Sequence, residues 1–128
     1  MRKEKAFGYY QILDLYQCKS SVVGDIKVCY NYLDKLAEFL KLKKVSPPFI
    51  IYTDEKKYPD KAGLSGWIPL QDETTNRYCG VSIHTLTVTR FVSIDIYTTR
   101  KFDRKKIKEF TFKIFKPKNF ESKYLLRK

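Results

Sequence analysis

Two neighbouring stretches decide the fold of this chain: Val-Ser-Ile-His-Thr-Leu at residues 81–86 and Phe-Val-Ser-Ile-Asp-Ile-Tyr-Thr-Thr at residues 91–99. In both stretches apolar and polar residues alternate with a period of two, which is typical of a half-buried β-strand. The link around Val88–Arg90 is too short for a parallel crossover, so residues 79–87 and 91–98 are predicted to form an antiparallel hairpin.

The first stretch contains His84, the only histidine among the 128 residues. Any proton transfer near neutral pH that uses a histidine must therefore use this one. A lone histidine in a strand is more often structural than catalytic, so a catalytic role for His84 needs support from the surrounding sequence.

The residues on either side of the hairpin predict further strands and two helices. Residues 6–18 alternate in the same way and predict a strand. After Ser20-Ser21, which offers N-cap chemistry, apolar residues recur at spacings of three and four and predict an amphipathic helix over about 22–42. Asp103 is expected to cap a second helix over about 104–116, which Pro117 ends. The apolar face of the first helix is predicted to comprise Ile26, Cys29, Tyr30, Leu33, Leu36, Ala37 and Leu40.

Shorter elements complete the expected order. Strands are predicted at 49–52, 64–71 and 124–126, and Pro69 places the second of these near an edge or a bulge. Turn formers predict a loop at 58–63 and an inserted polar loop at 72–77.

This order predicts an α+β fold, a two-layer sandwich with an antiparallel sheet and helices on one face, formed by residues 1–128 as one domain. In the strands at 6–18 and 91–98 both alternating sets contain apolar or aromatic residues, which indicates burial on both sides of the sheet.

The composition indicates a globular protein. Apolar residues make up 43% and aromatic residues 16% of the chain. The longest uncharged apolar run is far shorter than the roughly 20 residues of a membrane helix, and residues 1–5 lead into no signal-peptide core, so a cytoplasmic protein is expected. The cysteines, Cys18, Cys29 and Cys79, form no Cys-x-x-Cys pair and are odd in number, so neither a metal site nor a disulfide framework is indicated.

Positive charge is concentrated towards the C-terminus. The net charge is +12, and residues 100–128 carry twelve Lys or Arg against three acids, or +9. Such a patch can attract nucleic acid or an anionic surface. We favour a solvated helix face, because the lysines alternate with apolar residues at helical spacing, and a nucleic-acid partner is the weaker hypothesis. The residues concerned are Lys105, Lys106, Lys108 and Lys113, with Ile107, Phe110 and Ile114 between them.

Three blocks of the sequence occur in the order, and at the approximate spacing, of a known enzyme family. Gly8–Cys18 is similar to that family's first strand, and Gly63–Trp67 resembles its Gly-x-Ser-Gly strand. His84-Thr85 and Ser93–Thr99 resemble its His-Thr pair and the Val-Asp-Val-Phe-Thr-Cys strand that follows. On these residues the chain resembles the bacterial-type S-adenosylmethionine decarboxylases, pyruvoyl-dependent lyases of spermidine and other polyamine biosynthesis.

The resemblance implies a ligand, a cofactor and an assembly. The ligand would be S-adenosylmethionine or a related small molecule, and two protomers would pack sheet against sheet, or share a site, as a homodimer. The cofactor would be a pyruvoyl group made by autocatalytic cleavage. In the family, the serine of a Glu-Ser bond attacks that bond, and elimination turns the new N-terminal serine into pyruvoyl.

Several functional positions of the family are substituted here. The family's cleavage serine lies five residues before its histidine, a position that Cys79 holds in this chain, after Tyr78. There is no serine between Gly66 and Val81. The family's proton-donating cysteine falls at Thr99, and the acidic residue after its His-Thr pair falls at Val88. Ser65 and His84 are the functional residues that the resemblance retains.

The resemblance assigns roles to these residues. His84 would be the base for the elimination, with Ser65 hydrogen-bonding the intermediate. Cys79 is the candidate pyruvoyl precursor, because a thiolate could form a thioester with the backbone. Thr74, preceded by Glu73, is a weaker candidate that would leave a ketobutyryl group.

The same residues have structural interpretations. Ser65 and His84 could be inward polar residues satisfied by their neighbours. Thr99 is a poor proton donor, since a hydroxyl is a far weaker acid than a thiol. Asp95, in an otherwise apolar strand, is expected to be a buried, paired structural carboxylate.

Three hypotheses of function follow. The first is an S-adenosylmethionine decarboxylase of altered activity. The second is a catalytically degenerate relative that serves as a nucleoside-binding or partner subunit. The third is a basic nucleic-acid-binding module that uses the C-terminal charge.

Overall fold

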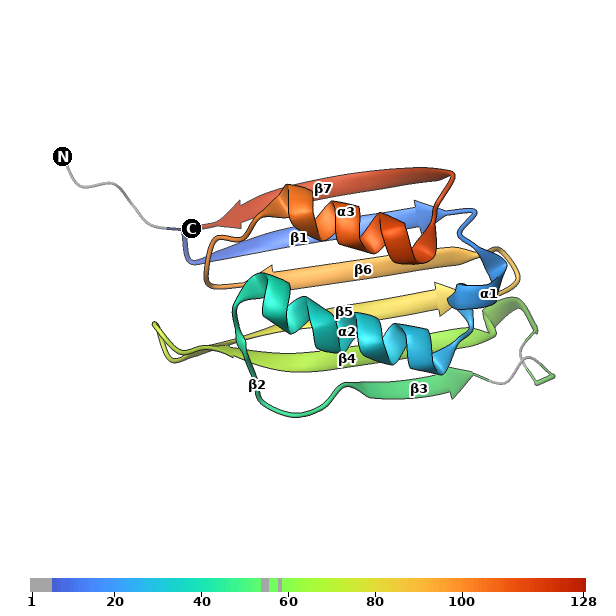
Figure 1. The fold of residues 1–128 in the computed structure, drawn as a ribbon, viewed down its shortest axis with the longest axis horizontal. Helices are drawn as coiled ribbons and strands as arrows, with labels where there is room; N and C mark the ends of the chain where they lie inside the picture. The colour runs from blue at the N-terminus through green and yellow to red at the C-terminus, as the bar shows by residue number, and fades with distance from the viewer. Residues whose placement is uncertain (1–5, 54–55, 58) are drawn as a thin grey trace.

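The computed structural model describes residues 6–53, 56–57 and 59–128 (Figure 1). Tyr58, which the sequence assigns to a turn-rich loop, lies outside these residues. In chain order the elements are β1 (Gly8–Tyr16), α1 (Ser20–Val23), α2 (Ile26–Leu40), β2 (Lys43–Lys44), β3 (Phe49–Thr53), the short 3-10 helix η1 (Pro59–Lys61), β4 (Gly63–Asp72), β5 (Arg77–Leu86), β6 (Phe91–Thr98), α3 (Arg104–Phe115) and β7 (Asn119–Arg127).

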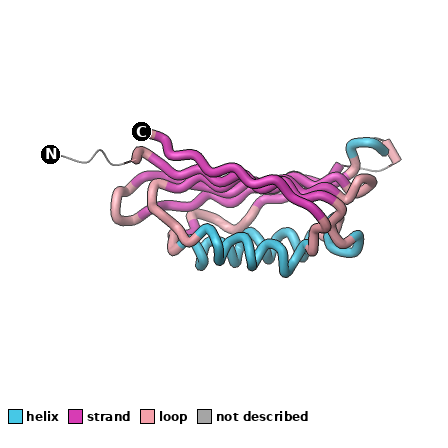
Figure 2. Tube along the Cα trace, turned by 90° about the horizontal axis from the view of Figure 1, so that it is seen from above, coloured by secondary structure: helices cyan, strands magenta, loops and turns pink. Residues whose placement is uncertain are grey.

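The strands form one antiparallel sheet with α2 and α3 on one of its faces. The strand order is β2-β4-β5-β6-β1-β7, and β3 pairs with β4 beside β2. Both long helices lie on the same side of this sheet (Figures 1 and 2). The predicted α+β two-layer fold is confirmed.

The hairpin predicted from the deciding stretches is β5–β6. Its register runs from Gly80 opposite Tyr97 to Leu86 opposite Phe91. Alternate side chains of these strands are fully buried under the helices, and the side chains between them point the other way. We call the face covered by the helices the inner face and the opposite one the outer face. The buried residues of the inner face include Val81, Ile83, Val92, Ile94 and Ile96.

The first predicted helix is interrupted near its start. Ser20 and Ser21 lie in the short helix α1 instead of capping the long one, and Gly24 ends α1. The cap of α2 is Asp25, whose carboxylate accepts a hydrogen bond from the Val28 amide at 3.1 Å. Aspartate is among the preferred N-cap residues, which explains why the long helix starts after Asp25 and not after the serines.

The apolar face of α2 also differs from the prediction at two positions. Ile26 and Tyr30 are exposed, whereas Tyr32 is buried. The Tyr32 hydroxyl lies 2.7 Å from the Thr111 hydroxyl of α3, so this ring fills the seam between the helices with its polar atom paired. The remaining predicted positions, Cys29, Leu33, Leu36, Ala37 and Leu40, are buried as expected.

Helix α3 follows the sequence closely. The Asp103 carboxylate accepts from the Lys106 amide at 3.1 Å, which confirms the predicted cap. The helix ends at Phe115, and Lys116 takes a left-handed conformation just before Pro117. The strand predicted at 124–126 is part of a longer strand, β7, that pairs with β1 along its whole length.

The polar run at 72–77 is not an irregular insert, because residues 73–76 form the tight turn of the β4–β5 hairpin. Asp72 ends β4, Arg77 begins β5, and the two residues are paired across the hairpin. The extra length therefore lengthens two paired strands. Asn76 takes the left-handed conformation, with φ 58°, that asparagine tolerates in turns.

Pro69 lies inside the sheet, but at a gap in it. Strand β4 pairs with β5 on one side and, on the other, with β3 up to Trp67 and with β2 from Leu70 onwards. The Pro69 carbonyl accepts from the Val45 amide at 3.1 Å on that second side. The missing N–H of the proline thus faces the break between β2 and β3, where no ladder bond is lost.

Candidate functional site

Ser65 and His84 face each other on neighbouring strands. They are register partners of β4 and β5, and the Ser65 hydroxyl lies 3.0 Å from His84 Nδ1. Both side chains are exposed on the outer face, so the structural interpretation that placed them inward is wrong. The hydrogen bond fixes the orientation of the imidazole and leaves its second nitrogen towards solvent.

The polar side chains continue across the outer face from His84. Ser93 of β6 is the next register partner of His84, and its hydroxyl donates to Asp14 of β1 at 2.7 Å. A polar track thus crosses four strands, from Ser65 through His84 and Ser93 to Asp14, on the face without helices.

Asp95 lies beside this track and is partly buried. Burial raises the pKa of the Asp95 carboxyl, and Asp14 raises it further, whereas His84 and a hydrogen bond from Tyr10 act in the opposite direction. Asp95 was expected to be a buried, paired structural carboxylate, but it is partly exposed and faces the outer side, with Tyr10 acting on its pKa.

Aromatic rings surround Asp95 in a shallow hollow of about 330 Å³ on the outer face. Rings around one carboxylate suit a cation, because ring faces and the carboxylate both attract positive charge. Sequence reasoning missed these rings, although all belong to the outward set of their alternating strands. The hollow is lined by Tyr10, Trp67, Tyr78, Cys79, Gly80, Ser82, Asp95 and Tyr97.

Cys79 and Thr99 meet on the inner face instead. The Thr99 amide donates to the Cys79 sulfur at 3.3 Å, and the Thr99 hydroxyl lies 3.4 Å from the same sulfur. Cys79 lines the outer hollow, but its side chain belongs to the inward set of β5 and the residue as a whole is 8% exposed. The other thiols are deeper still, and burial raises the pKa of Cys18 to about 11 and that of Cys29 to about 12.

Asp72 is the centre of this inner cluster and was not singled out from the sequence. Its carboxylate accepts from the Thr99 hydroxyl at 2.9 Å, the Thr74 hydroxyl at 2.6 Å and the Thr74 amide at 3.0 Å. Burial acts to raise the pKa of Asp72, but these hydrogen bonds outweigh it and hold the pKa below its usual range.

The structure does not bring His84 together with either candidate for self-cleavage. Cys79 and His84 lie five positions apart on one strand, so their side chains are on opposite faces and about 17 Å apart along it. Thr74 lies in the turn beyond Arg77, at least about 23 Å from His84 by the same rise per residue. In this structure the Cys79 thiol therefore lies away from His84, and no serine stands at the position of the family's cleavage serine.

Three further features concern Val88, metal sites and membrane-spanning helices. Val88, at the position of the family's acidic residue, is exposed in the turn between β5 and β6. Within the described residues no three or more His, Cys, Asp or Glu side chains gather as a metal site. Over the same residues no helix has the length and apolar character needed to span a bilayer.

Comparisons with known proteins agree with the fold and with the sequence blocks. The family model described as S-adenosylmethionine decarboxylase matches residues 10–128. The chain is 29% identical over 124 residues to the S-adenosylmethionine decarboxylase proenzymes of Clostridium botulinum strains Langeland and Okra, covering 96% of this chain and 96% of each relative. The crystal structure of the adenosylmethionine decarboxylase from Aquifex aeolicus VF5 superposes with a TM-score of 0.74 at 18% identity, covering 97% of this chain and 92% of that one.

Proposed function

Because this chain belongs to the S-adenosylmethionine decarboxylase family, we propose that it acts in polyamine biosynthesis as a ligand-binding member that makes no pyruvoyl group. It binds S-adenosylmethionine, or a related cationic nucleoside, on the outer face of its sheet. One observation carries the proposal: Cys79 replaces the family's cleavage serine, and it is buried with its thiol bound to the Thr99 amide.

Self-cleavage needs a nucleophile at the bond to be broken and a base beside it. The Cys79 thiol is held towards the inner face by the Thr99 amide, away from the only imidazole of the chain. No serine lies between Gly66 and Val81 to replace it. The unprocessed chain would then lack the electron sink that decarboxylation requires, since no standard side chain is such an electrophile.

The outer hollow supports the binding part of the proposal. S-adenosylmethionine carries a sulfonium cation next to a planar adenine, and the aromatic rings of Trp67, Tyr78 and Tyr97 can contact both. A cation over a ring face contributes about 0.5–2 kcal/mol, depending on how far water is excluded. Asp95 adds the opposite charge at the same place. His84 is outside the lining but near enough to lower the pKa of Asp95, and it is hydrogen-bonded to Ser65.

The outer face also supports a homodimer, which we propose as the working assembly in the cytoplasm. Large apolar side chains are exposed there on β3, β4, β5 and β7, and an apolar sheet face without helices is typical of an interaction surface. A second copy packed sheet against sheet would cover them and enclose the hollow. The exposed residues are Phe49, Ile51, Trp67, Tyr78 and Leu125.

Two measurements on the purified protein test the proposal. Intact mass spectrometry should give one uncleaved species of 15.2 kDa. Isothermal titration calorimetry should detect S-adenosylmethionine binding that weakens in Trp67→Ala but not in Phe120→Ala, a matched aromatic removal on β7, outside the hollow.

The alternative function, decarboxylation through a pyruvoyl group made at Cys79, gives a different mass result. Cys79 lines the hollow, so this residue is already next to the proposed ligand. Cleavage between Tyr78 and Cys79, with a blocked N-terminus on the C-terminal fragment, would overturn the unprocessed reading. Absence of any S-adenosylmethionine binding would overturn the ligand.

A further inference from the structure

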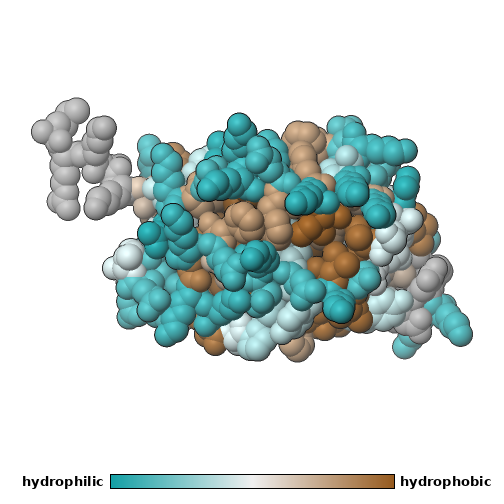
Figure 3. Space-filling view, in the orientation of Figure 1, coloured by the Kyte–Doolittle hydropathy of each residue, from teal (hydrophilic) through white to brown (hydrophobic). Residues whose placement is uncertain are grey.

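A groove of about 830 Å³ runs between α2 and α3, on the face of the molecule opposite to the hollow. Its floor is apolar and is formed by Phe39 of α2, Phe110 of α3 and Phe102 of the segment before α3. The rings of Phe39 and Phe110 stack at 4.5 Å between centroids, and Phe110 stacks on Tyr32 at 5.5 Å. In the space-filling view, hydrophilic side chains border an apolar strip between the two helices (Figure 3).

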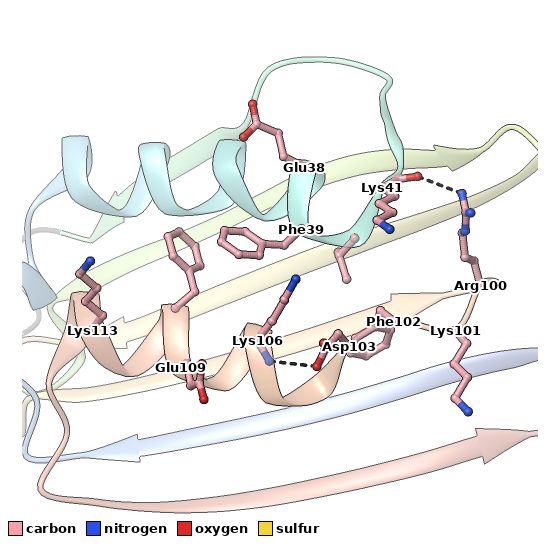
Figure 4. A pocket seen from close by; sticks show the side chains of 12 residues that line it. Glu38, Phe39, Lys41, Arg100, Lys101, Phe102, Asp103, Lys106, Glu109 and Lys113 are labelled. Atoms are coloured by element: carbon pink, nitrogen blue, oxygen red, sulfur yellow. Dashed lines mark hydrogen bonds between the residues drawn. The ribbon is translucent and has the colours of Figure 1, made fainter.

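Cations outnumber acids around the groove. Its lining contains five basic residues, Lys41, Arg100, Lys101, Lys106 and Lys113, and three acids, Glu38, Asp103 and Glu109. The acids are directed elsewhere. Glu38 pairs with Lys35 at 2.8 Å, and Asp103 is engaged as the helix cap. Figure 4 shows Lys106 reaching from α3 towards α2, while Glu38 and Glu109 point away from the space between the helices.

The surrounding segment carries the same charge. Residues 100–118 contain nine Lys or Arg and two acids, a difference of +7 within the net +12 of the chain. A field of one sign around an apolar groove attracts a partner of the opposite sign and orients it before contact.

We propose that this groove docks an acidic amphipathic helix of a partner protein. The apolar face of such a helix would lie on the phenylalanine floor, in the helix-in-groove mode. Lys106 and Lys113 are two turns apart on α3, about 10.5 Å along its axis, so glutamates spaced seven residues apart on a helix lying alongside would meet both. The occupant is thus defined by apolar residues on one face and glutamate or aspartate at heptad spacing beside them.

Other occupants fit the groove less well. A second copy of this chain would bring its own +12 and the same basic helix face against these lysines. Single-stranded nucleic acid binds by stacking bases on open ring faces. Here Phe39 and Phe110 are partly buried and stacked on each other, Phe110 also stacks on Tyr32, and Phe102 is buried.

The test uses designed peptides and charge-matched variants of the full chain. The probe is a fluorescein-labelled helical peptide with leucine at the a and d positions and glutamate at the e and g positions of each heptad. Fluorescence anisotropy should show saturable binding below about 100 µM, weakened at least about tenfold in Lys106→Glu/Lys113→Glu. The control variant Lys123→Glu/Lys128→Glu makes the same charge change on or beyond β7, outside the groove lining, and should bind within about twofold of the parent.

Each other result overturns the proposal. Equal weakening in both double variants would mean non-specific attraction to a basic protein, and so would equal binding of polyglutamate. Tighter binding of an oligothymidylate than of the peptide would assign the surface to nucleic acid. No binding of the probe at about 100 µM would leave the groove without this function. Circular dichroism melts of both variants check that these exposed substitutions leave the fold intact.

Discussion

The two faces of the sheet hold their carboxylates in opposite ways. On the inner face, Asp72 is 1% exposed and accepts three hydrogen bonds, which hold its pKa below the usual range. On the outer face, Asp95 is partly desolvated beside Asp14, and its pKa is raised. The ionised inner carboxylate therefore stabilises the fold. Partial burial destabilises the ionised outer carboxylate, and a bound cation would offset that cost.

The largest effect is expected at Asp72. Asp72→Ala removes the acceptor of the Thr74 amide and of the Thr74 and Thr99 hydroxyls, so donors are left unpaired near the core. We expect the free energy of unfolding to fall by about 2–3 kcal/mol. Urea denaturation measures it, and Glu73→Ala in the same turn, an exposed residue, should change it by less than about 0.5 kcal/mol.

The contribution of Asp72 to the free energy of unfolding should depend on pH, in a direction that follows from its pKa. The folded pKa of Asp72 lies below its unfolded value, so its contribution is fully present above the unfolded pKa, about 3.9, and is lost as the pH falls through the folded pKa. The stability difference between parent and Asp72→Ala should therefore be constant above about pH 5 and shrink in stronger acid. A difference that grows on acidification would contradict the hydrogen-bond assignment.

The opposite behaviour is expected at Asp95. Its folded pKa is raised, so the ionised carboxylate lowers stability above that pKa, and Asp95→Asn should leave stability at pH 7 unchanged or higher. The same substitution removes the negative charge from the hollow and should weaken S-adenosylmethionine binding about tenfold. Calorimetry and urea denaturation of one preparation measure both quantities. A loss of stability together with unchanged affinity would mean that Asp95 is a structural residue.

The sequence predicted the structure that depends on residues close together in the chain, and it missed contacts between distant elements. Periodicity and capping residues were sufficient for the hairpin β5–β6 and for α3, because both depend on neighbours in the sequence. The burial of Tyr32 depends on Thr111 of the other helix, a contact that no local pattern contains. The polar run at 72–77 predicts a loop because it lacks periodicity and consists of turn formers, and the pairing of its ends, Asp72 and Arg77, depends on contacts across the hairpin.

The same distinction between local patterns and long-range contacts applies to the residues of the candidate site. Ser65 and His84 were expected to act together, and the structure places them in hydrogen-bond contact. Cys79 holds the position of the family's cleavage serine, five residues before His84, and an odd spacing along a continuous strand puts the two side chains on opposite faces. The parity of β5 could have separated them from the sequence alone. Asp72 could not have been found in this way, since its role depends on Thr99, which follows β6.

The smallest effect is expected for the pair Ser65–His84 itself. Both side chains are exposed, so Ser65→Ala and His84→Ala should each change stability by less than about 0.5 kcal/mol, with a coupling of about 0.5 kcal/mol in the double-mutant cycle. These values apply at protein concentrations where light scattering gives the monomer mass. In the monomer, water competes for hydrogen bonds with the Ser65 and His84 side chains. If a second copy covers the outer face, the same cycle at dimer-forming concentrations should give a larger coupling, because hydrogen bonds shielded from water are costlier to break. A coupling that is the same at both concentrations would place this pair outside any dimer interface.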